Sequence, residues 1–306
     1  MKISFVIPAY NRAHTIKRTV DSLLNQTYTK MEYEIIIVDD GSTDNLRKVI
    51  DSYDSESLKK IKYLYKENGG ISDARNYGVS KADGEYIIFV DSDDYVSKNL
   101  LKDINKCISK NIDLIKWQPI FVDDDCKEIG RPEGVSFDVT SGEDGFNRLY
   151  GWDPLISCVW NYAIKREIVE KFPKDRVHED YGTMPLMILN AKTMISLDKR
   201  EYYYVKTPTS FMRGIDEKKW SKRCTDLLWQ FDRLIEKSEK LNISNKTKKN
   251  LRTLATNGLI VMARDTQGNV RKKFIKGIKD RKVYKYIQVN NLKQFIKKCI
   301  IMIKYR

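Results

Sequence analysis

The sequence predicts an α/β fold in which helices flank a mostly parallel sheet, with a helical extension at the C-terminus. Three observations lead to this fold class. Short apolar runs alternate with helical patterns through the first 100 residues, several of these runs end in acidic or turn residues, and residues 216–306 carry lysine-rich helical patterns with few turn signals. Ligands of such sheets bind beyond the carboxyl ends of the strands, so the residues that end each run are the first candidates for a site.

The elements of the sheet can be followed from the N-terminus. ISFVIP predicts a first strand closed by Pro8, and HTIKRTVDSLLNQTY places apolar residues at helical spacing. YEIIIVDDGS predicts a second strand, and IKYLYKE predicts a weaker third strand after a polar, helix-like stretch. The next helix is expected to start near Asp73 with Ser72 as its cap, and EYIIFV is the fourth strand.

The middle of the chain continues the alternation less regularly. We expect a helix over residues 98–110, a strand at DLIKWQPIFV, an acidic turn at DDDC and an aromatic segment over residues 150–160. HEDYGTMPLMILNA opens with acids and becomes helix-like. These patterns predict a domain of residues 1–215 followed by a helical region of residues 216–306.

Composition narrows the class of protein. A hydrophobic fraction of 41% and an aromatic fraction of 11% are typical of a soluble globular chain. The five cysteines are odd in number and contain no CxxC pair, which argues against a disulfide framework or a zinc site and for a reducing compartment. The N-terminal apolar run is too short for a signal peptide, and no apolar stretch is long enough for a membrane span. We therefore expect a cytoplasmic protein.

The positive charge is concentrated at the C-terminus. Residues 271–306 contain 13 Lys or Arg against one acid, so they carry +12 of the net +14. This distribution gives no reason to expect a nucleic-acid partner for the whole chain. Residues 289–303 space their apolar side chains as an amphipathic helix does, which predicts contact with an anionic membrane surface at the inner face of the cell membrane. The alternative is a helix packed on the domain or on a neighbouring subunit, and a homo-oligomer stays open.

The segment YIIFVDSDDYV places three carboxylates directly after a buried strand. Asp91, Asp93 and Asp94 would repel one another and raise one another's pKa unless positive charge lies among them. One interpretation is an acidic turn with a helix cap. The other is a divalent metal site, because Asp91 and Asp93 project to one side of an extended chain and oxygen ligands suit Mn2+ or Mg2+.

The ordered motifs SFVIPAYNR with SLLNQTY, EIIIVDDGSTD, GGISDARNYG, YIIFVDSDDYV and HEDY resemble those of glycosyltransferase family 2. The resemblance covers roughly residues 1–215. Within the family, the chain is similar to the bacterial members that build capsule or other surface polysaccharides. It implies a GT-A (Rossmann-like) fold and an inverting transfer from a nucleotide-diphosphate sugar, here a UDP-hexose. The implied acceptor is a saccharide, lipid-linked in one interpretation.

The resemblance also implies which residues bind the nucleotide. Asp40 matches the aspartate that accepts a hydrogen bond from uracil, and Arg75 matches an arginine near the uridine and the phosphates. Out of context, the alternative for Asp40 is part of a helix cap and turn, and the alternative for Arg75 is a surface arginine on a helix. The implied nucleotide-binding residues are Pro8, Ala9, Tyr10, Asn11, Asp40, Arg75, Asp91 and Ser92.

The chemical roles follow from the same resemblance. Asp93 would hold the metal together with Asp91, and the metal would neutralise charge on the departing UDP. Asp180 in HEDY would deprotonate the acceptor hydroxyl. Acids at a helix start are also explained by the helix dipole alone, which is the alternative for this motif. Residues with supporting or acceptor-facing roles would be His178, Glu179, Asp94, Trp152 and Trp160.

Two other functions compete with this hypothesis. A sugar-nucleotide pyrophosphorylase has a related sheet but needs a glycine-rich phosphate loop after the first strand, and IPAYNRAH contains no glycine. A non-catalytic module that binds membrane or nucleic acid through the basic tail would not need the D-x-D and E-D motifs. The donor sugar, the acceptor and the linkage are not readable from these residues.

Overall fold

The computed structural model describes residues 2–206 and 216–288, which form two compact units. Unit 1 comprises Met1–Asp175 and Leu186–Pro208, and unit 2 comprises Arg176–Pro185 and Thr209–Arg306. The segment with HEDY thus groups with the C-terminal helices, whereas the sequence had placed it in the sheet domain. The amphipathic helix predicted over residues 289–303 lies outside the described residues.

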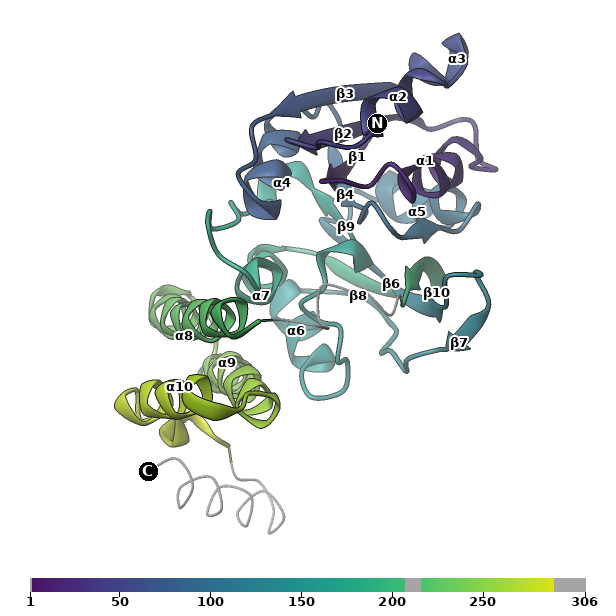
Figure 1. Ribbon diagram of the computed structural model, residues 1–306. Helices are drawn as coiled ribbons and strands as arrows, with labels where there is room; N and C mark the ends of the chain where they lie inside the picture. The colour runs from purple at the N-terminus through teal and green to yellow at the C-terminus, as the bar shows by residue number, and fades with distance from the viewer. Residues whose placement is uncertain (1, 207–215, 289–306) are drawn as a thin grey trace. The chain divides into compact units, whose positions relative to one another are not determined.

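Unit 1 contains the whole sheet (Figure 1), in the order β3-β2-β1-β4-β9-β6-β10-β5, with β7 beside β6 and β8 beside β10. Strands β1, β2, β3 and β4 pair in parallel, as do β6 and β10, while β9 runs antiparallel between β4 and β6. The mostly parallel α/β architecture that the alternation predicted is therefore confirmed. The strands are β1 (Lys2–Ala9), β2 (Glu32–Asp40), β3 (Ile61–Lys66), β4 (Tyr86–Phe89), β5 (Tyr95–Val96), β6 (Leu114–Val122), β7 (Glu128–Gly130), β8 (Phe137–Thr140), β9 (Tyr162–Lys165) and β10 (Met194–Val205).

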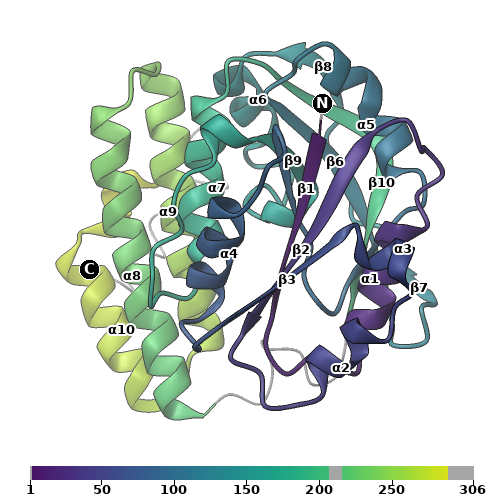
Figure 2. The ribbon, with the colours of Figure 1, turned by 90° about the horizontal axis from the view of Figure 1, so that it is seen from above.

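Helices cover both faces of this sheet. The helices and 3-10 turns of unit 1 are α1 (Ile16–Leu24), α2 (Leu46–Asp51), α3 (Ser55–Leu58), α4 (Ile71–Ser80), α5 (Leu100–Ser109), α6 (Gly142–Leu149), η1 (Val159–Asn161) and η2 (Arg166–Ile168). Figure 2 shows α4 on one side of β1 and β2 and α1 on the other. Helix α4 starts at Ile71 with Gly70 as its N-cap, so the expected cap at Ser72 was wrong. Gly70 has φ 82°, a left-handed conformation that glycine adopts without strain.

Alternation along β1 produces the two faces. Ile3, Phe5 and Ile7 are fully buried in one core cluster, which also contains the apolar residues of α1 and α5. Val6 points to the other face, where a Cβ on Gly78 of α4 would collide with it. Because strand side chains alternate, one apolar run serves both layers.

Unit 2 is helical. It contains α8 (Glu217–Lys240), α9 (Asn245–Asp265), α10 (Gly268–Asp280), η3 (Val283–Tyr286) and the first part of α7 (Glu179–Asn190), whose remainder belongs to unit 1. Asp216 and Ser244 cap α8 and α9 by accepting hydrogen bonds from backbone N–H groups. Apolar residues of α8, α9 and α10 are buried, among them Phe231, Leu259 and Phe274. Within the described part of the chain, no helix combines the length and apolar character that a membrane crossing needs.

Candidate active site

The motifs that follow β1, β2 and β4 meet at one edge of the sheet. Strand β1 is paired with β2 up to Ala9 opposite Asp39, and with β4 on its other side, so the loops after these strands are neighbours. Asn11, with φ 52°, joins two of the loops: its backbone N–H donates to Ser42 Oγ at 2.9 Å and its side chain accepts from Thr43 N–H at 2.8 Å. Asparagine tolerates the left-handed conformation better than most residues, which suits it to this junction. Pro8 and Ala9 are buried, and Tyr10 is 48% exposed.

Asp40 is the last residue of β2 and is almost fully buried. Its carboxylate accepts hydrogen bonds from Lys66 Nζ at 2.7 Å and from the backbone N–H groups of Gly69 at 2.9 Å and Gly70 at 2.7 Å. These donors explain how a carboxylate can be buried here. They also occupy much of its accepting capacity, so the hydrogen bond to uracil stays a prediction. Gly41 has φ 79°, and a Cβ there would lie 2.8 Å from Asn68 N, which requires glycine.

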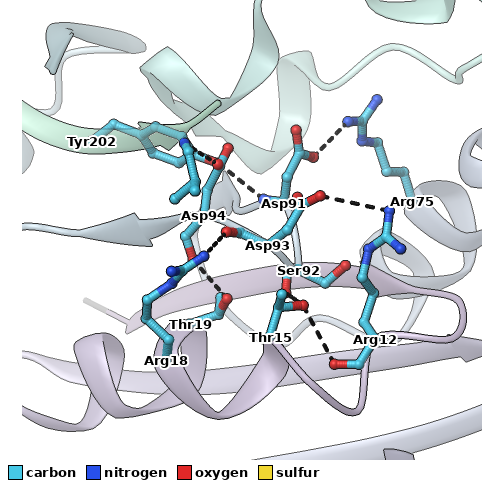
Figure 3. A network of polar contacts seen from close by, with 11 residues as sticks. Arg12, Thr15, Arg18, Thr19, Arg75, Asp91, Ser92, Asp93, Asp94 and Tyr202 are labelled. Carbon is cyan, nitrogen blue, oxygen red and sulfur yellow. Dashed lines mark hydrogen bonds and ion pairs between the residues drawn. The ribbon is translucent and has the colours of Figure 1, made fainter. Parts of the chain in front are cut away.

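Arginines lie among the aspartates that follow β4 (Figure 3). Arg75 Nη2 is 3.1 Å from Asp91 Oδ1, and Arg12 Nη2 is 3.5 Å from Asp93 Oδ2. Arg18 donates to the backbone carbonyl of Asp93 at 2.6 Å. The positive charge that these carboxylates need therefore comes in part from guanidinium groups. The sequence reasoning named only Arg75.

Arg75 is held rigidly. Only 3% of its side chain is exposed, and its guanidinium lies 5.8 Å from the ring centre of Phe89 and 5.5 Å from that of Phe172. Aromatic faces favour a cation at such distances. A fixed guanidinium beside a carboxylate is well suited to phosphate oxygens.

Asp94 has a structural environment different from that of its neighbours. It is 2% exposed, and its two oxygens accept hydrogen bonds from the Tyr202 hydroxyl at 2.8 Å and from Val205 N–H at 2.8 Å. The same hydroxyl accepts a hydrogen bond from Asp91 N–H at 3.1 Å, so Tyr202 ties the DSDD turn to β10. Burial, followed by the charges of Asp91 and Asp93, raises the pKa of Asp94 well above its usual range. Asp94 is thus placed as a residue that holds the turn.

Asp91 and Asp93 could supply some, but not all, of the ligands of a metal ion. Their side chains are 25% and 37% exposed. Burial and the charge of Asp91 raise the pKa of Asp93, which Arg12 offsets only in part. Among the residues that the structure describes, no three His, Cys, Asp or Glu side chains form a closed metal site. Two carboxylates fit an ion that takes its other ligands from water and a diphosphate, as Mg2+ commonly does.

The two predicted acceptor tryptophans differ in exposure. Trp152 is 78% exposed, whereas Trp160 is 5% exposed and stacks on Tyr202 with ring centres 4.5 Å apart. Packing alone accounts for Trp160, which supports the rings behind the DSDD turn. An exposed indole can stack on the face of a sugar ring, so Trp152 is the better candidate for contact with the acceptor.

The HEDY segment belongs to unit 2. Asp180 is partly exposed at the start of α7, and its Oδ1 accepts a hydrogen bond from Tyr181 N–H at 2.7 Å. Glu179 is 6% exposed. Burial and the charge of Arg223 lower the pKa of His178 against the opposing charges of Glu179 and Asp226. The imidazole is therefore neutral at pH 7.

Several site residues were missed by sequence reasoning. Arg12 directly follows the Asn11 loop, so its position after a strand end was a usable signal. Lys66 likewise ends β3 at the same edge. Arg18 and Tyr202 gave no comparable signal, because a helical arginine and a strand tyrosine are common in any α/β protein.

Known proteins resemble this chain in sequence and in fold. A family model described as Glycosyl transferase family 2 matches residues 4–188. Poly(ribitol-phosphate) beta-N-acetylglucosaminyltransferase TarS of Staphylococcus aureus is 39% identical over 208 residues, which are 67% of this chain and 35% of TarS. A poly(ribitol-phosphate) beta-glucosyltransferase of Bacillus spizizenii is 46% identical over 103 residues, which are 33% of this chain and 16% of that relative. The match thus spans about a third or less of either relative.

A solved structure shows the same fold. The crystal structure of Staphylococcus aureus TarS residues 1–349 in complex with UDP-GlcNAc superposes with a TM-score of 0.74 at 21% identity, covering 94% of this chain and 82% of that one. At this identity the likeness establishes the fold.

Proposed function

Since this chain belongs to glycosyltransferase family 2, we propose that it transfers a hexose from a UDP-sugar to a hydroxyl group of a saccharide acceptor. The observation that carries the proposal is the cluster after β4, in which Asp91 and Asp93 are each paired with an arginine. This cluster lies at the edge of the sheet where the loops after β1 and β2 begin. A nucleotide diphosphate presents phosphate oxygens and an imide N–H, and this edge carries cations and carboxylates that match both.

Each part of the donor has proposed partners. Pro8, Ala9, Tyr10 and Asn11 line the base pocket together with Asp40. Arg75 binds phosphate oxygens, and Asp91 with Ser92 faces the ribose. Exposure of Tyr10 supports its role, because a half-exposed ring can stack on a base.

A divalent ion completes the proposed site. Asp93, with Asp91, would hold Mn2+ or Mg2+, because both side chains are partly exposed and carboxylate oxygens are the ligands that these ions prefer. When bound, the ion would act as a Lewis acid toward the leaving diphosphate.

The proposed transfer is a single displacement. Asp180 accepts the proton of the acceptor hydroxyl as its oxygen forms a bond to the anomeric carbon, and the bond from that carbon to the diphosphate breaks to release UDP. Inversion converts an α-linked donor into a β-linked product. The names of both relatives describe beta-transferases, which agrees with this stereochemistry.

The relatives also suggest where to look for the sugar and the acceptor. Both are named for transfer to poly(ribitol-phosphate), but one for N-acetylglucosamine and the other for glucose. We therefore propose a bacterial surface glycan as the acceptor, lipid-linked during its synthesis. UDP-GlcNAc and UDP-glucose are the first donors to test.

We further propose that the protein works in the cytoplasm, at the inner face of the membrane. In α10, Val270, Phe274 and Ile278 are buried while the lysines of the opposite face are exposed. Clustered lysines near an anionic leaflet each contribute about 1 kcal/mol. Sedimentation with phosphatidylglycerol vesicles but not with phosphatidylcholine vesicles would support this location, and equal sedimentation with both would contradict it.

The transfer is tested by UDP release from a panel of nucleotide sugars with Mn2+, Mg2+ or EDTA. We expect one donor to be turned over in a metal-dependent manner. Asp93→Asn and Asp180→Asn should each lower kcat by about a hundredfold or more, whereas Asp51→Asn, which breaks an exposed pair with Arg47, should leave it unchanged. If no donor is consumed and neither UDP nor UDP with Mn2+ raises the melting temperature, the proposal fails.

A further inference from the structure

We propose that the helical unit positions the base: Asp226 of α8 and Tyr181, anchored on α9, hold the segment that carries Asp180. This inference rests on the proposed role of Asp180. The segment Arg176–Pro185 belongs to unit 2, so its local geometry is set by helices that follow it by some 40 to 80 residues. The C-terminal helices would therefore be part of the catalytic apparatus.

Asp226 is the first of the two anchors. It is 1% exposed, and its carboxylate accepts hydrogen bonds from Val177 N–H at 3.1 Å, Arg176 Nη1 at 2.7 Å and Lys222 Nζ at 2.8 Å. Burial pushes the pKa of Asp226 upward, but these hydrogen bonds prevail and keep it below its usual value. The charged carboxylate thus fixes the backbone three residues before Asp180.

Asp226 also supports an unusual backbone conformation. His178, between Val177 and the start of α7, has φ 58°, which is left-handed. A non-glycine residue keeps such a conformation only when its surroundings impose it. With Val177 N–H bound to Asp226, the chain enters the first turn of α7 in one direction, and that direction sets where the Asp180 carboxylate points.

The second anchor lies on the C-terminal side of Asp180. The Tyr181 hydroxyl donates to the carbonyl of Leu254 and accepts from Gly258 N–H at 3.1 Å, so one side chain joins α7 to α9. Arg233 of α8 donates to the carbonyl of Gly182 at 2.6 Å. Asp180 is thus flanked on both sides by residues whose positions are fixed from α8 and α9.

The experiment measures kcat, donor KM and UDP affinity for Asp226→Asn and Tyr181→Phe, both of which keep the side-chain shape. Asp232→Asn is the matched control, because Asp232 is on the same helix and pairs with Arg281 at 2.7 Å, away from the segment. Misplacement of a catalytic group by about 1 Å lowers a rate by about a hundredfold. We expect kcat to fall between about tenfold and a hundredfold in both test variants, with donor KM and UDP affinity within about twofold of the wild type.

Amide hydrogen exchange supplies a second measurement on the same proteins. Faster exchange is expected at Val177 and Tyr181 in Asp226→Asn, with unchanged exchange in the strands of unit 1. If kcat stays within about twofold of the control in both variants, or falls only together with UDP affinity, the inference is overturned. Wild-type activity in Asp180→Asn would instead refute the proposed base, so the two failures are distinguishable.

Discussion

Replacement of Tyr202 by phenylalanine removes one oxygen atom from the centre of the DSDD turn. This hydroxyl is fully buried, accepts a hydrogen bond from Asp91 N–H and donates one to Asp94 Oδ2. The ring itself stays stacked on Trp160. The change therefore tests the hydrogen bonds without opening a large cavity.

The expected magnitude follows from these two bonds. A hydrogen bond between neutral groups contributes about 0.5–1.5 kcal/mol, and this range applies to both bonds because the raised pKa of Asp94 favours its uncharged form. Loss of the hydroxyl also leaves one oxygen of the buried Asp94 carboxyl group without that partner, which is unfavourable. We expect the free energy of unfolding to fall by about 1–3 kcal/mol.

Urea denaturation followed by tryptophan fluorescence measures this change, with Tyr203→Phe as the control. Tyr203 is the next residue of β10, and its ring stacks on Tyr95 with centres 4.5 Å apart. The control should change stability by less than about 0.5 kcal/mol. A loss in Tyr202→Phe no larger than that of Tyr203→Phe would refute the reasoning that this hydroxyl holds the turn.

Three further changes test other parts of unit 1. Burial, followed by a hydrogen bond that the protonated carboxyl group of Glu201 donates to Asp103, raises the pKa of Glu201 to about 7. The folded state therefore keeps a proton that the unfolded chain loses, and stability falls as pH rises from about 4.5 to 7. In urea titrations the wild type should lose more stability between pH 5 and 8 than Glu201→Gln does, and the difference between the two losses should be at most roughly 3 kcal/mol. Equal losses in both proteins would contradict the assignment. Gly78→Ala should destabilise by about 1–3 kcal/mol, while Gly130→Ala, whose Cβ would lie 3.9 Å from its nearest neighbour, should be close to neutral in thermal melts. Lys116→Met, which leaves a buried aspartate unpaired, should lower the unfolding free energy by about 3–5 kcal/mol, and a change below 1 kcal/mol would show that this ion pair is dispensable.

Much of unit 1 was predictable because its signals are local. Apolar runs such as ISFVIP and YEIIIV specify strands, and parallel strands joined by helices bring their carboxyl ends to one edge. The meeting of Asn11 with Ser42 and Thr43 follows from that rule alone. The cap of α4 was not predictable in the same way, because both Gly70 and Ser72 are acceptable N-caps and the choice depended on how the preceding loop packs.

The sequence by itself determined the order of strands from β1 to β4, the family motifs and the identity of the carboxylates after β4. Only the tertiary structure decided what surrounds them. Arg12 reaches Asp93 from 81 residues away in the chain, and Tyr202 reaches Asp94 from 108 residues away. It also decided that the Asp180 segment belongs with the helices of unit 2. Such contacts join residues that no local pattern relates, because hydrogen bonding and charge depend on distance in space, whereas periodicity and propensity act along the chain.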